Sequence, residues 1–148
     1  MNDGGGQLLV TFLDPSPTSP NEISVCGDRR YSAQDPTTQP VTVSLSGTPG
    51  LGQTATMTMT GGQPNAPHAL FAALAPAELP LPFSTSKQMI SSLGFIAPMT
   101  AGPSGTAQFA LPVPPIPSLV GVSLFFQDWT LAGTAVVASS GLEIKFCQ

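Results

Sequence analysis

The segments VTVSLS (Val41–Ser46) and TATMTMT (Thr54–Thr60) alternate apolar and hydroxyl-bearing side chains without interruption. Successive side chains of a β-strand point to opposite faces, so a period of two is typical of a half-buried strand. The expected inward-facing residues are Val41, Val43 and Leu45 in the first segment and Ala55, Met57 and Met59 in the second. These two segments therefore predict a sheet with one face in an apolar core and one hydroxyl-rich face in water.

Turn signals divide the rest of the chain into pieces of strand length. The chain contains 17 Pro and 15 Gly, residues that interrupt helices and favour turns. The predicted loops are Asp14–Asn21, Gln34–Pro40, Gly47–Gly50, Gly61–Pro67, Ala101–Gly105 and Pro112–Pro117. The further predicted strands are Gln7–Leu13, Ala69–Leu74, Thr106–Leu111, Leu119–Gln127, Thr134–Ala138 and Leu142–Phe146. This spacing of turns is typical of a sandwich or barrel of short strands.

Two segments have a less definite pattern. Ala69–Leu74 could form a helical turn, but Pro67 and Pro76 leave little room for one, so we predict a strand. Ser86–Leu93 is the best candidate for a short helix, because Lys87, Gln88 and Met89 are acceptable helix formers.

The predicted fold is all-β: a single antiparallel β-sandwich, jelly-roll or Ig-like, with eight or nine short strands and little helix. A chain of 148 residues fits one domain of ordinary size. We expect residues 1–6 to form a flexible N-terminal tail and residues 7–148 to form the sandwich domain.

The shortage of charge excludes several classes of protein. Charged residues make up 8% of the chain, against about 25% in an average soluble domain. Four Lys and Arg side chains are too few for the basic surface that phosphate binding requires, so we expect no nucleic-acid partner. The hydrophobic content of 41% is sufficient for a core. No apolar run approaches the roughly 20 residues of a membrane helix, so we expect no membrane insertion.

Cys26 and Cys147 are the two cysteines of the chain, and they lie near its opposite ends. An even count in a chain rich in Ser and Thr favours a disulfide, although two independent buried thiols are the alternative. Residues 1–6 show neither the basic region nor the apolar stretch of a leader peptide. The chain is then either cytosolic or a mature or engineered form without its leader, and the composition favours an extracellular or cell-surface location.

A set of motifs in the second half of the chain resembles a known kind of module. The motifs are Ala69–Leu74, Leu79–Phe83, Pro114–Gly121 leading to Leu124–Gln127, and Ser139–Ile144. Roughly residues 41–147 resemble the C-terminal β-sandwich modules of secreted bacterial proteins of unknown function. Those modules carry a Pro-x-x-x-x-Leu-x-Gly … Phe-Gln strand and a Ser-x-Gly-Leu turn into the last strand. The resemblance implies a secreted β-sandwich and leaves its activity undefined.

The ionisable residues give no pattern typical of catalysis or metal binding. His68 is the only histidine, no acidic residue is near it in sequence, and no Gly-x-Ser-x-Gly motif is present. Asp28 and Asp35 flank a loop that could hold calcium through backbone carbonyls, but the acidic alternation of a dedicated calcium loop is missing. Two Cys and one His also lack the spacing of a zinc site. We expect no enzyme activity, no cofactor and no metal.

Trp129 is the candidate for ligand contact. It follows Asp128 just after a predicted strand, and an exposed Trp at the edge of a sandwich could stack on a sugar ring. The alternative is that Trp129 covers the end of the core. A carbohydrate- or surface-binding module, with a glycan or a cell-surface protein as its partner, is therefore the second functional hypothesis.

The N-terminal region supplies the first functional hypothesis. Gly4, Gly5 and Gly6 precede the apolar segment Gln7–Leu13, in which Leu8, Val10 and Phe12 share one face. Such a segment could leave its own domain and pair with the sheet edge of a neighbour, or it could be an ordinary first strand. With the low charge and the predicted disulfide, this pattern favours a structural or assembly subunit of a fibre, sheath or shell whose partners are copies of itself.

Overall fold

The computed structural model of the chain describes residues 26–31, 41–81 and 84–148. These residues form antiparallel strands joined by turns and one short 3-10 helix at Pro117–Leu119, which confirms the all-β sandwich. Within these ranges, no helix has the length and apolarity that crossing a membrane requires.

The described residues contain eleven strands, more than the eight or nine predicted. In chain order they are β1 (Gly27–Tyr31), β2 (Thr42–Ser46), β3 (Thr54–Thr60), β4 (Pro67–Ala73), β5 (Pro76–Pro80), β6 (Lys87–Ile90), β7 (Gly94–Thr100), β8 (Ala107–Pro112), β9 (Ser123–Ala132), β10 (Ala135–Ala138) and β11 (Gly141–Lys145).

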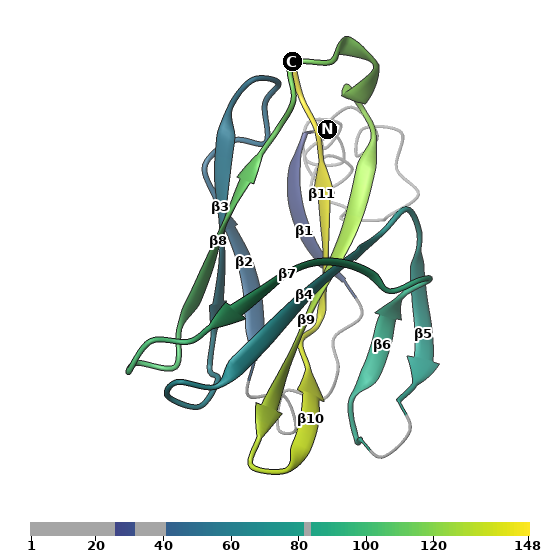
Figure 1. Cartoon of the computed structure of the whole chain (residues 1–148). Helices are drawn as coiled ribbons and strands as arrows, with labels where there is room; N and C mark the ends of the chain where they lie inside the picture. The colour runs from purple at the N-terminus through teal and green to yellow at the C-terminus, as the bar shows by residue number, and fades with distance from the viewer. Residues whose placement is uncertain (1–25, 32–40, 82–83) are drawn as a thin grey trace, which may run out of the picture.

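The strands are arranged in two packed sheets and a separate hairpin (Figure 1). The large sheet has the order β1-β11-β9-β4-β7, with β10 also paired to β9. The small sheet has the order β2-β3-β8, and β5 pairs with β6 alone. The core lies between the large and small sheets, where Met57 and Met59 of β3 meet Leu70 of β4, Phe126 of β9 and Leu142 of β11.

The alternating segments fold as their pattern predicts. β3 has the predicted bounds, and its inward-facing Ala55, Met57 and Met59 are fully buried. In the predicted strand Leu142–Phe146, which covers β11 and the residue after it, Leu142, Ile144 and Phe146 are buried at alternate positions. The ambiguous segment around Ala69 is the strand β4. Period-two patterning therefore identified the strands that have one face on the core.

The short helix predicted over Ser86–Leu93 is wrong, because Lys87–Ile90 forms β6. Helix propensity at these positions differs from strand propensity by only a fraction of a kcal/mol and is easily overridden by tertiary contacts. Here the side-chain amide of Gln127 accepts a hydrogen bond from the backbone N–H of Met89 and donates one to the carbonyl of Lys87. These bonds hold the segment extended.

The strand predicted over Leu119–Gln127 starts later and ends later than expected. Pro117–Leu119 forms the 3-10 helix, and the left-handed φ of 80° at Gly121 separates it from β9. Val120 is consequently exposed and does not share the inward face that Val122, Leu124 and Phe126 form.

Some sequence predictions fall on residues outside the described part of the chain. They are the tail 1–6, the strand Gln7–Leu13 with Leu8, Val10 and Phe12, the loops Asp14–Asn21 and Gln34–Pro40, and Asp35.

The predicted disulfide between Cys26 and Cys147 is confirmed. Its Cα atoms are 5.2 Å apart and 121 residues apart in sequence. The bond joins the beginning of β1 to the residues after β11, next to the pair Gly27 and Lys145. Backbone hydrogen bonds from Cys147 N–H to the Pro49 carbonyl and from Leu51 N–H to the Cys147 carbonyl attach this end to the loop after β2. The disulfide therefore fastens one end of the large sheet close to the small sheet.

Candidate functional site

The side chains of β9 alternate between the core and the outer face of the large sheet. Phe126 lies in the core, and the fully buried Asp128 contacts His68 of β4. Because neighbouring side chains alternate, Phe125, Gln127, Trp129 and Leu131 belong to the outer face.

The β5–β6 hairpin covers the middle of this outer face. The buried amide of Gln127 bonds to Lys87 and Met89 of β6 and donates a further 2.8 Å hydrogen bond to the carbonyl of Ser139. From β1, the hydroxyl of Tyr31 donates a 2.6 Å hydrogen bond to the carbonyl of Met89. Burial, with a smaller effect from the Glu143 charge, raises the pKa of Tyr31 to about 12. Tyr31 therefore holds the hairpin as a neutral donor at physiological pH.

Beyond the hairpin, the outer face exposes a row of large apolar side chains. The ring centroids of Phe71 and Trp129 are 5.1 Å apart, and those of Phe71 and Phe95 are 5.8 Å apart. Leu131 and Val136 face each other across β9 and β10 and extend the row. Phe95, Leu131 and Val136 are 58%, 40% and 37% exposed. We call these five residues, Phe71, Phe95, Trp129, Leu131 and Val136, the aromatic face.

An open groove of about 370 Å³ runs along the aromatic face. Its lining residues are Pro67, His68, Ala69, Phe71, Pro98, Trp129, Thr130, Leu131 and Val136. The hydroxyl of Thr130 is already engaged, since it donates a 2.8 Å hydrogen bond to the carbonyl of Pro67. The indole Nε1 of Trp129 is buried and has no hydrogen-bond partner among the described residues. The groove thus presents mainly apolar surface and no acidic or basic side chain other than His68, whose ring is turned inward.

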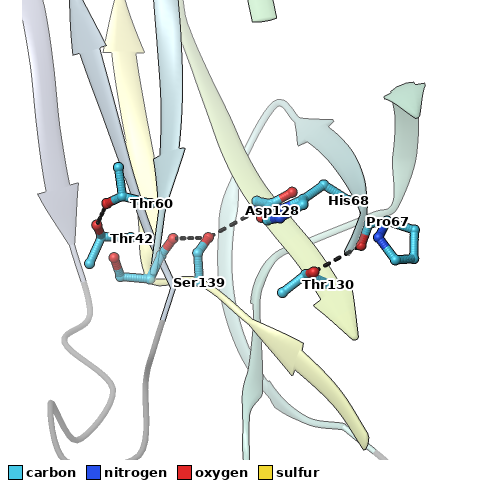
Figure 2. A network of polar contacts seen from close by, with 8 residues as sticks. Thr42, Thr60, Pro67, His68, Asp128, Thr130 and Ser139 are labelled. Carbon is cyan, nitrogen blue, oxygen red and sulfur yellow. Dashed lines mark hydrogen bonds and ion pairs between the residues drawn. The ribbon is translucent and has the colours of Figure 1, made fainter. Parts of the chain in front are cut away.

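His68 and Asp128 form a polar pair inside the sandwich, on the core side of the same strands (Figure 2). Nδ1 of His68 and Oδ2 of Asp128 are 2.7 Å apart, and both side chains are completely buried. The backbone N–H of Asp128 donates a 3.0 Å hydrogen bond to Ser139 Oγ, as Figure 2 also shows. Burial raises the pKa of Asp128, and the hydrogen bond and charge of His68 reverse this shift only in part. The carboxyl group is therefore harder to ionise than one in water.

Glycine turns close over the free side of the His68 ring. A Cβ atom on Gly62 would lie 2.8 Å from His68 Nε2, and one on Gly105 would overlap the carbonyl of Gly62. Nε2 of His68 and Oδ1 of Asp128 have no hydrogen-bond partner among the described residues. A His–carboxylate pair is part of a hydrolytic triad only when the ring is aimed at a nucleophile. Here the ring faces glycine backbone, so the pair acts as an internal connection between β4 and β9.

We expect Gly62→Ala to destabilise the fold by about 1–3 kcal/mol, because the added methyl group overpacks the His68 ring. Urea unfolding followed by circular dichroism measures the change. Gly102→Ala is the matched control, since its Cβ would find its nearest neighbour at 3.8 Å. Equal stability of the two variants would contradict the closed packing around Nε2.

Sequence reasoning missed this pair because its members are 60 residues apart. Sequence reasoning considered only acidic residues close to His68 along the chain, and none is close there. The signal was present in the alternation of β9: extending the inward face of Leu124 and Phe126 by two residues places Asp128 inward. A buried acidic side chain needs a polar partner, and the single His was the natural candidate.

The structure places the other candidate residues as follows. Trp129 is part of the aromatic face, where it packs against Phe71, and Phe71 in turn packs against Phe95. Sequence reasoning connected neither phenylalanine with it. Asp28 is an exposed residue of β1. Within the described ranges, no group of three or more His, Cys, Asp or Glu side chains gathers as metal ligands would.

Fold and site together define a disulfide-closed antiparallel β-sandwich with an exposed aromatic face on its large sheet. The chain matches no protein-family model, and no curated protein or solved structure is significantly similar to it.

Proposed function

We propose that this chain is an extracellular structural subunit that assembles with copies of itself through the aromatic face. The proposal rests on one observation. Phe95, Leu131 and Val136 are exposed and, with Trp129 and Phe71, form a contiguous apolar surface. Contiguous apolar patches on soluble proteins mark interaction sites. Interface centres are enriched in aromatic side chains and depleted of charge, as this face is.

The edge of the large sheet supports the same proposal. β7 pairs with β4 and with no other described strand, so its second edge is open. Its seven residues, GFIAPMT, carry no charge, although natural sheets often protect open edges with Lys or other charged side chains. Low charge throughout the chain also weakens repulsion between copies. The disulfide is typical of proteins in oxidising compartments, which supports the extracellular location.

We expect Phe95→Asp and Leu131→Asp each to raise the concentration at which half of the chain assembles by about 10- to 100-fold. Each substitution places a charge where apolar surface would be buried between copies. Sedimentation velocity over a concentration series measures the effect, and negative-stain electron microscopy shows whether the particles are filaments or closed shells.

Ile116→Asp is the matched control for these variants. Ile116 is 49% exposed, like the target residues, but it lies in the loop after β8. The proposal is wrong if the unmodified chain stays monomeric at all concentrations, or if Ile116→Asp impairs assembly as strongly as Phe95→Asp does.

A carbohydrate-binding module is the second candidate, and the row of Phe71, Phe95 and Trp129 is the observation that favours it, because aromatic faces stack on sugar rings. It ranks second because the hydroxyl of Thr130 in the groove is already engaged and the unpartnered indole N–H of Trp129 is buried, which leaves little to recognise sugar hydroxyls. Trp129 is the only tryptophan, so its fluorescence during glycan titration reports this site directly. A saturable change that Phe71→Ala removes would support the module.

A further inference from the structure

We infer that the open edge of β7, which carries Phe95 of the aromatic face, receives the segment Gln7–Leu13 of a neighbouring copy as an added strand. The inference rests on the proposed function and names the part of the partner that occupies the site.

Composition selects this segment among those outside the described residues. These segments are 1–25, 32–40 and 82–83. Residues 32–40 read SAQDPTTQP and contain no large apolar side chain, and 82–83 is too short to form a strand. Gln7–Leu13 (QLLVTFL) carries no charge, and Leu8, Val10 and Phe12 occupy alternate positions, so they would share one face of a strand. An apolar strand face of this kind can be buried against the uncharged apolar side chains beside β7.

The length and position of β7 match a strand-addition site. β7 has seven residues, as many as the segment, and its Phe95 belongs to the aromatic face. In strand addition, main-chain hydrogen bonds to the edge provide affinity, and alternate side chains enter pockets beside it. Pro98 cannot donate a hydrogen bond, so Gly94–Ala97 is the stretch in which every residue keeps its backbone N–H, with alternate residues directing theirs to the open edge. Exposed Phe95 and Ile96 lie within that stretch.

The β5–β6 hairpin, which covers the middle of the outer face, favours a neighbouring copy as the source of the segment. Within its own copy, the segment is tethered through Cys26 to Cys147, near the Ser123 end of β9 and at the β1 side of the sheet. The aromatic face begins at Trp129, beyond the hairpin that contacts Tyr31 and Gln127. Figure 1 shows the C-terminus at the opposite end of the sandwich from the turn between β9 and β10.

The chain between Leu13 and Cys26 limits how far the segment can reach within its own copy. Thirteen residue steps from Leu13 to Cys26 span at most about 45 Å. Crossing from β1 to β7 takes four strand spacings, about 19 Å, and the distance along β9 from Ser123 to Trp129 is about 20 Å. The two components combine to a straight-line distance of about 28 Å, and a path within one copy must add the detour around the hairpin, whereas a neighbouring copy can present the segment without that detour.

Photocrosslinking tests the inference on the full-length chain. Phe12 is replaced by p-benzoylphenylalanine, and ¹⁵N-labelled and unlabelled chains are mixed before assembly and irradiation. Mass spectrometry is expected to find crosslinks to β7 or to the aromatic face that join a labelled to an unlabelled chain. Crosslinks to this face only within one chain would overturn the inference, as would crosslinks to β2 or β8.

Paired substitutions separate this inference from the proposed function. Val10 lies on the predicted buried side of the segment. Val10→Asp is therefore expected to raise the concentration at which half of the chain assembles by about 10- to 100-fold. Thr11→Asp, its neighbour on the opposite side, is expected to change it less than about 3-fold. If both variants assemble normally while Phe95→Asp does not, the segment is not the occupant but the face still assembles. If Phe95→Asp also assembles normally, the proposed function itself is overturned.

Discussion

The Cys26→Ser/Cys147→Ser double variant is expected to lose about 4–5 kcal/mol of unfolding free energy relative to the oxidised chain. The bond closes a loop with a sequence separation of 121 residues, and in the chain-entropy description a long loop gives the largest restriction of the unfolded state. A domain of this size has a total stability of about 5–15 kcal/mol. Loss of the bond therefore removes a large share of the stability of the fold.

Urea unfolding of the double variant and of the oxidised wild type measures this loss. The wild type with its disulfide reduced by dithiothreitol is the internal control, because it should unfold at nearly the same urea concentration as the double variant. A double variant within about 1 kcal/mol of the oxidised wild type would contradict the expected effect, since the native contacts around Cys147 would then suffice alone.

The buried His68–Asp128 pair gives the second large effect. Asp128→Ala is expected to destabilise the protein by about 1–3 kcal/mol, because it leaves Nδ1 of the buried His68 ring without its hydrogen-bond partner. Asp128→Asn keeps an oxygen that can accept a hydrogen bond from Nδ1, and it should cost clearly less. Urea unfolding at pH 7 measures both variants. Glu78→Gln, at the exposed ion pair between Glu78 and Lys87, is the control and should be nearly neutral.

The same pair gives a pH dependence whose sign follows from the pKa of Asp128. Burial raises that pKa above the ordinary value of 3.8, so the folded state favours the protonated carboxyl more than the unfolded state does. Its contribution to stability is complete below pH 3.8 and is lost as the pH rises through the raised pKa. Relative to Asp128→Asn, the wild type should therefore become less stable as the pH rises from 4 to 7.

Unfolding curves of the wild type and Asp128→Asn at several pH values measure the contribution of the His68–Asp128 pair, because titrating groups that do not contact Asp128 cancel in the difference. A difference that stays constant with pH, or that changes in favour of the wild type as the pH rises, would contradict the raised pKa of Asp128.

The strands that could be predicted from the sequence are those with one face on the core. Thr54–Thr60 and Leu142–Phe146 show period-two alternation because one side of each strand meets the opposite sheet. β1 and β7 are edge strands, so charge at Arg29 and Arg30 and a proline at position 98 are tolerated there, and their sequences resemble loops. The Ser86–Leu93 prediction failed because Gln127, some forty residues away, determines the conformation of β6.

The candidate site was less predictable than the fold because it is assembled from separate strands. Trp129 was identified from the sequence as either a ligand contact or a cover for the end of the core, but Phe71 and Phe95 join it only through the pairing of β4 with β7 and β9. His68 and Asp128 meet through the same register. A single sequence shows which side chains share a face of one strand, and it does not show which strands are neighbours. The disulfide is the exception, because two cysteines leave only one pairing.

The position of the disulfide also determines how a subunit would carry tension. A pull on the chain ahead of residue 26 reaches the described part of the sandwich at Cys26, one residue before β1. Without the covalent bond, such a pull would peel β1 from β11 one hydrogen bond at a time. The bond instead passes the force directly to Cys147 and to the backbone hydrogen bonds that join it to Pro49 and Leu51. If copies assemble end to end under the proposed function, this bond lets each subunit transmit a mechanical load while its large sheet remains intact.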